Sequence, residues 1–70
     1  MKFSELKKVM TGNDRLDLLV MHSSKDGGLL GMTAKSCYVH AVPDDTLDCD
    51  VGHMYVTAGG SIHITLLKND

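Results

Sequence analysis

The chain has 70 residues and a slightly acidic charge balance, with seven Lys plus Arg against nine Asp plus Glu. This length predicts one small domain spanning residues 1–70, which buries only about 60% of the surface that its unfolded chain exposes. Domains of this size usually gain stability from a disulfide, a metal or a partner subunit. The absence of a basic run predicts that neither nucleic acid nor a membrane surface is a partner.

The first residues, Met1–Lys8, lack the apolar run of a signal peptide, and no segment is long and apolar enough to span a bilayer. We therefore expect a soluble, cytoplasmic protein. In a reducing cytoplasm Cys37 and Cys49 are expected to remain thiols rather than to form a disulfide.

A short helix is predicted at the start of the chain. Phe3, Leu6 and Met10 recur at helical spacing, Ser4 stands at a capping position, and Gly12 ends the segment. A helix of about two turns is too short to be stable alone. We expect it to form by packing its apolar side chains on a sheet.

The next segments have the alternating pattern of strands. In residues 15–22, Leu16, Leu18 and Val20 share one face, and Leu19 and Met21 share the other. A polar turn with two glycines leads into a returning strand at residues 29–35, in which Gly31 suggests a bulge. Residues 37–42 also have strong β character, and they either continue that strand or form a separate one that ends at Pro43.

A β-hairpin is the clearest element of the sequence. Residues 51–57 and 62–67 alternate apolar and polar side chains, and Gly59-Gly60 between them allows a tight turn. Ile62, Ile64 and Leu66 form an apolar stripe that we expect to be buried. Because every connection is short, the predicted fold is α+β: a short N-terminal helix packed on a four- to five-stranded, mostly antiparallel, curled sheet that resembles a small barrel.

Apolar side chains remain that one small helix cannot cover; they are Leu19, Met21, Met54, Val56 and Leu67. Burying them in a subunit interface predicts a homo-oligomer, most simply a two-fold dimer, with Met21 and Met54 in the contact. Such an interface would create a groove for a ligand, lined by His53, Tyr55 and His63.

Two pairs of potential zinc ligands stand close together in the sequence, Cys37-x2-His40 and Cys49-x3-His53. Their number and kind suit a tetrahedral zinc site. In extended chain, however, Cys37 and His40 point to opposite faces, and Cys49 and His53 lie roughly 13 Å apart. We therefore expect no metal, with a zinc-stabilised protein-interaction domain using these four residues as the alternative.

Signatures of catalysis are weak. No cation or helix N-terminus in the sequence marks either cysteine as an activated nucleophile. The acidic group formed by Asp44, Asp45, Asp48 and Asp50 lacks the glycine and terminal glutamate of a calcium loop. The glycine pairs are not followed by a helix that could hold a phosphate. We predict a protein that is not an enzyme and uses no cofactor.

Three segments carry a resemblance to known proteins: the opening Met1–Leu6, the residues Leu47–Val51, and the strand Ile62–Leu66. In this arrangement the chain resembles short accessory proteins encoded by Firmicutes bacteria and by their phages and prophages. The resemblance implies a small, non-catalytic binding module whose partner is a host protein or a small ligand, for example an inhibitor of a host defence system.

Overall fold

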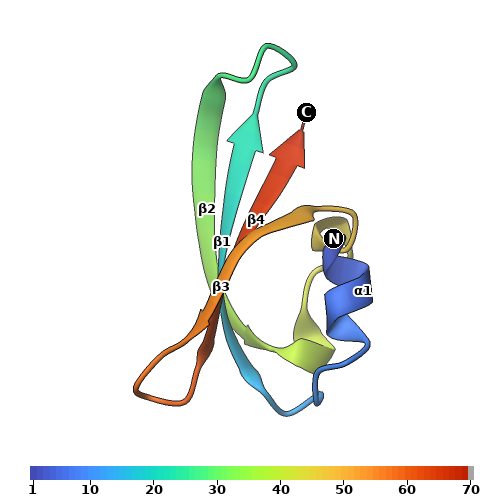
Figure 1. The fold of residues 1–70 in the computed structure, drawn as a ribbon, viewed down its shortest axis with the longest axis vertical. Helices are drawn as coiled ribbons and strands as arrows, with labels where there is room; N and C mark the ends of the chain where they lie inside the picture. The colour runs from blue at the N-terminus through green and yellow to red at the C-terminus, as the bar shows by residue number, and fades with distance from the viewer. Residues whose placement is uncertain (70) are drawn as a thin grey trace.

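One short helix and a four-stranded mixed sheet make up the fold, shown in Figure 1 as a computed structural model that describes residues 1–69. The elements in chain order are α1 (Phe3–Lys7), β1 (Arg15–Ser23), β2 (Leu29–Tyr38), two 3₁₀ turns (Val39–Ala41 and Asp44–Thr46), β3 (Asp50–Val56) and β4 (Ile62–Asn69). The predicted α+β class, with a short N-terminal helix on a sheet, is confirmed.

The strand order is β2-β1-β4-β3, so the last strand lies in the centre of the sheet next to the first. Two hairpins, β1 with β2 and β3 with β4, are antiparallel as predicted, whereas the central pair of β1 and β4 is parallel. The parallel pair arises because residues 39–49 cross over one side of the sheet instead of turning back beside β2. Among the described residues the sheet is open, with β2 and β3 as its edges, so it does not close into a barrel.

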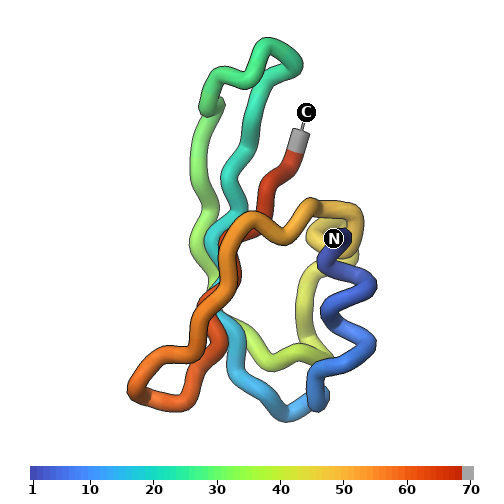
Figure 2. Tube along the Cα trace, in the orientation of Figure 1, coloured from blue at the N-terminus to red at the C-terminus, as the bar shows by residue number. Residues whose placement is uncertain are grey.

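Main-chain contacts set the start of α1. The Phe3 amide donates to the Cys49 carbonyl at 2.9 Å, and the Ser4 amide donates to the Leu47 carbonyl at 3.0 Å. Figure 2 shows the resulting course, with the N-terminal segment running beside the crossover segment. Lys2 is the N-cap and Ser4 lies inside the helix, so the predicted capping role of Ser4 is wrong, and the helix is shorter than expected.

The chain leaves the sheet after Tyr38, so the strand predicted over residues 37–42 is wrong in its second half. The amides of Val39 and His40 donate to the carbonyls of Asp14 and Gly12, at 3.0 and 3.2 Å. These bonds tie the segment to the loop before β1 and allow Val39 to be buried at 2% exposure. Burial of a β-branched side chain in a turn thus overrides its β propensity.

Both tight turns use a glycine at positive φ. Gly60 in the predicted β3–β4 hairpin has a φ of 85°, and so does Gly27 in the turn between β1 and β2. An L side chain at either position would be strained, since this region of φ suits glycine. A bulge also occurs next to Gly31, where the register places the extra residue at Leu30.

The core lies between the sheet and the layer formed by α1 and the crossover segment. Its buried apolar members are Phe3, Leu6, Leu16, Leu18, Val20, Val39, Val42, Cys49, Ile64 and Leu66. The stripe predicted in β1 is confirmed, as are Ile64 and Leu66 of β4, while Ile62 is partly buried against the same cluster. Within residues 1–69 one side of the sheet is thereby covered, and the other is left bare.

Candidate functional site

The bare side of the sheet is referred to below as the open face. Cross-strand register assigns its members, because directly paired residues project to the same side. They are Asp50, His53 and Tyr55 of β3, His63, Thr65 and Leu67 of β4, Arg15, Asp17, Leu19 and Met21 of β1, and Met32, Ala34, Ser36 and Tyr38 of β2. Arg15, Asp17 and Asp50 are the charged side chains of this set, with Arg15 and Asp50 at the first positions of β1 and β3.

Three rings gather at the β3 edge of the open face. The Tyr55 and His63 rings stack, with centroids 4.8 Å apart and planes 14° apart. His53 lies next to Tyr55 with a centroid distance of 5.6 Å and a tilt of 56°. The structure therefore brings together the three residues that the sequence predicts to line a ligand groove. Tyr55 is 49% exposed, so the cluster is accessible from solvent.

Apolar side chains occupy the middle of the open face. Met21 pairs with Met32 of β2 on one side and with Leu67 of β4 on the other, which forms a row across three strands. Met32 is 59% exposed and Leu67 is 40% exposed. Leu19 pairs with Ala34 in the row beside it. These rows form a continuous apolar strip.

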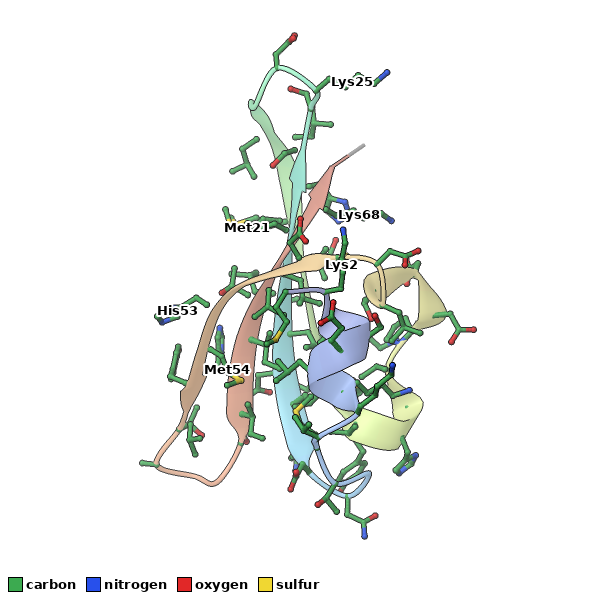
Figure 3. All side chains as sticks on the ribbon, turned by 45° about the vertical axis from the view of Figure 1, so that its right-hand side comes forward. Lys2, Met21, Lys25, His53, Met54 and Lys68 are labelled. Atoms are coloured by element: carbon green, nitrogen blue, oxygen red, sulfur yellow. The ribbon has the colours of Figure 1, made fainter. Side chains whose placement is uncertain are left out.

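Met54 and Val56 lie on the opposite side of the sheet from Met21, which corrects the prediction that Met21 and Met54 share an interface. They pair with Ile64 and Ile62, whose side chains face the core layer. The physical reason is a bulge between Val51 and His53, which reverses the alternation of side chains in the rest of β3. Figure 3 shows Met21 projecting from the other side of the sheet than Lys68.

Asp17 is held in place by a hydrogen bond across the strands. The Ser36 hydroxyl donates to Asp17 Oδ1 at 2.6 Å. On its other side Asp17 pairs in register with His63, so the carboxylate lies between a hydroxyl donor and the ring cluster. Asp17 therefore has a fixed hydrogen-bond partner on β2 and lies beside the ring cluster on β4.

A second feature lies on the covered side of the sheet, where α1 does not reach. It is a groove with a volume of about 340 Å³ between the strands and the crossover segment. Its lining residues are Leu18, Val20, His22, Thr33, Lys35, Pro43, Asp45, Thr46, Cys49 and Lys68. Lys68 Nζ and Asp45 Oδ2 approach to 3.8 Å across its mouth. The sequence did not indicate this groove, because the crossover segment that closes it follows from the parallel pairing.

The four candidate zinc ligands are spread over the molecule. Cys37 is partly buried in β2, and Cys49 is buried at the end of the crossover segment. His40 stacks on Tyr38 with centroids 5.7 Å apart, and His53 lies on the open face. Within residues 1–69 no group of three or more His, Cys, Asp or Glu side chains is arranged to hold a metal ion.

The Cys49 thiol is expected to react slowly in the folded protein. Burial raises the pKa of Cys49, and the nearby Lys68 ammonium offsets this only in part. Since the thiolate is the nucleophile, alkylation by iodoacetamide at neutral pH should modify Cys37 at least about tenfold faster than Cys49. Mass spectrometry of timed samples measures the two rates, and denaturant should make them similar. Equal rates in the folded protein would contradict the buried position of Cys49.

None of the helices in residues 1–69 combines the length and the apolar character needed to cross a membrane. Comparisons of the chain with protein-family models, with curated proteins and with solved structures gave no match.

Proposed function

We propose that the protein is a small, non-catalytic binding module that works as a homodimer, with the open face of one copy packed on the open face of the other. The observation that supports this most directly is the composition of that face. Apolar side chains occupy its middle and rings its β3 edge, and no helix or loop among the described residues packs on it. A sheet face of this composition is stable when another layer covers it.

A second copy of the chain is a suitable covering layer on electrostatic grounds. Interface cores are enriched in Tyr and Met and depleted in charged residues, and the strip formed by Leu19, Met21, Met32 and Leu67 shares this composition. In a two-fold dimer both copies use the same surface, so a charged side chain near the axis lies close to the identical side chain of the other copy. Within the middle of the face that charge is Asp17, whose carboxylate accepts a hydrogen bond from the Ser36 hydroxyl, while Arg15 and Asp50 lie at the first positions of their strands.

Stability also favours association. The buried apolar cluster of a monomer comes from one side of the sheet only, and small cores rarely supply more than about 3–5 kcal/mol. Covering Leu19, Met21 and Leu67 would add a second apolar layer at about 25 cal/mol for each Å² removed from water. Two curled sheets stacked in this way would also give the assembly the barrel-like enclosure that one open sheet lacks.

The target of the dimer is a host component in this proposal. The resemblance of the chain to short phage and prophage proteins supports a cytoplasmic host protein, as an inhibitor of a defence system would require. The ring cluster of His53, Tyr55 and His63 lies at the β3 edge, where the rim of a dimer would hold it within reach of a ligand.

Sedimentation velocity across a range from nanomolar to high micromolar concentration tests the oligomeric state. We expect a species of twice the 7.6 kDa chain mass at micromolar concentration, with dissociation on dilution. The mass of one chain at every concentration would refute the dimer.

A further inference from the structure

We propose that the groove on the covered side of the sheet binds a small amphipathic anion, with Lys35 toward one end and Lys68 toward the other attracting its carboxylate or phosphate group and the apolar floor between them holding its hydrocarbon part. The groove opens on the side of the sheet opposite the open face. Ligand binding in the groove is therefore independent of the proposed dimer. Sedimentation velocity tests the dimer, and NMR titration tests the groove.

Register places the groove residues on one side of three neighbouring strands. Lys35 pairs with Leu18, and Thr33 pairs with Val20, whereas Lys68 pairs with His22. The buried side chains of Leu18 and Val20 form the floor between the two lysines. Pro43, Asp45 and Thr46 of the crossover segment form the opposite wall. The space remains because α1 covers only part of the sheet, and the β1–β2 hairpin extends beyond it (Figure 1).

The charges around the groove favour an anion. Lys35 and Lys68 come from the strands on either side of β1, and they line the groove together in a chain whose net charge is −2. Among the described side chains Lys35 has no ion-pair partner. Lys68 pairs with one described carboxylate, that of Asp45, at 3.8 Å and with 71% of the Asp45 side chain exposed. An exposed pair of this kind is worth at most about 1 kcal/mol, so a ligand anion can replace Asp45.

Polar atoms on the walls restrict the orientation of a ligand. His22 Nε2 and Thr33 Oγ1 are hydrogen-bonded at 3.2 Å and lie at the same end of the groove as Lys68. The Thr46 hydroxyl donates to the Pro43 carbonyl at 2.7 Å, so that wall offers mainly apolar surface. A volume of about 340 Å³ is at the small end of ligand sites and accommodates one ring bearing an anionic group.

Heteronuclear NMR titration tests the proposal with four probes: phenyl phosphate, benzoate, inorganic phosphate and benzyl alcohol. We expect phenyl phosphate or benzoate to shift the amides of Val20, Thr33 and Thr46, with a dissociation constant of about 0.1–1 mM. The probe that binds more tightly identifies the anionic group. Inorganic phosphate and benzyl alcohol should each bind at least about tenfold more weakly, because each lacks one half of the interaction.

Variants separate a specific site from general charge attraction. Lys35→Gln and Lys68→Gln should each raise the dissociation constant of the tighter-binding probe by about five- to tenfold, since each removes one cation from the groove. Lys25→Gln makes the same change of charge in the turn between β1 and β2, away from the groove (Figure 3), and should leave binding unchanged. Asp45→Asn should strengthen binding several-fold, because it removes the competing carboxylate from Lys68.

Three results would overturn the proposal. The first is that neither aromatic anion shifts the groove amides. The second is that inorganic phosphate binds as tightly as phenyl phosphate. The third is that Lys25→Gln weakens binding as much as Lys68→Gln. Amide spectra of each variant without ligand check that the fold is intact, so loss of binding can be separated from loss of structure.

Discussion

Leu66→Ala should lower the free energy of unfolding by about 2–5 kcal/mol. Leu66 has no exposed surface and lies in the central strand β4, where its side chain contributes to the single apolar core. A core of this size rarely supplies more than about 3–5 kcal/mol, so the loss is a large share of the stability of one chain and should shift unfolding to a clearly lower urea concentration. Urea denaturation followed by circular dichroism measures the effect.

Leu30→Ala is the matched control, because it deletes the same atoms from a side chain that is 63% exposed. Its cost should stay within about 0.5 kcal/mol, as is usual for surface positions. If the two variants unfold at the same urea concentration, the assignment of Leu66 to the core is wrong.

Met21→Asp should dissociate the dimer. Met21 lies in the middle of the apolar strip on the open face, between Met32 and Leu67. In a two-fold interface the substitution places two carboxylates in an apolar environment, and burying unpaired charges costs several kcal/mol. The dimer dissociation constant should rise by about two orders of magnitude or more, which sedimentation velocity detects as a shift to the mass of one chain.

Met54→Asp serves as the control for Met21→Asp. Met54 is 48% exposed and pairs with Ile64, on the side of the sheet that the interface does not use. The same substitution there should leave the dimer mass unchanged. Dissociation by Met54→Asp, with no effect of Met21→Asp, would place the interface on the covered side of the sheet and contradict the open-face dimer.

Local patterns in the sequence predicted the elements well. Alternation in residues 15–22 identified the buried face of β1, and Gly59-Gly60 located the β3–β4 hairpin. These features depend on neighbouring residues, so their signal is present in a short window of sequence. The adjacency of Tyr55 and His63 could be predicted for the same reason, since both lie in that hairpin.

Features that depend on distant residues were missed. The side to which Met54 projects depends on a bulge at Gly52, where a Cβ would approach the Leu67 side chain to 3.3 Å. The turn at Val39 depends on the carbonyl groups of Gly12 and Asp14. Lys35 and Lys68 meet in one groove only because β2 and β4 flank β1. No periodicity within a segment contains this information.

The parallel pairing of β1 with β4 has a consequence for how the protein is made. Leu18 lies beside Ile64, and Leu16 lies beside Ile62, so the centre of the sheet joins segments from opposite ends of the described chain. A nascent chain that has reached only β3 contains the β1–β2 hairpin but not the strand that completes its core. Isolated two-stranded hairpins are marginal in water. The core can therefore form only after β4 has left the ribosome, and until then the apolar residues of β1 stay exposed and prone to aggregation.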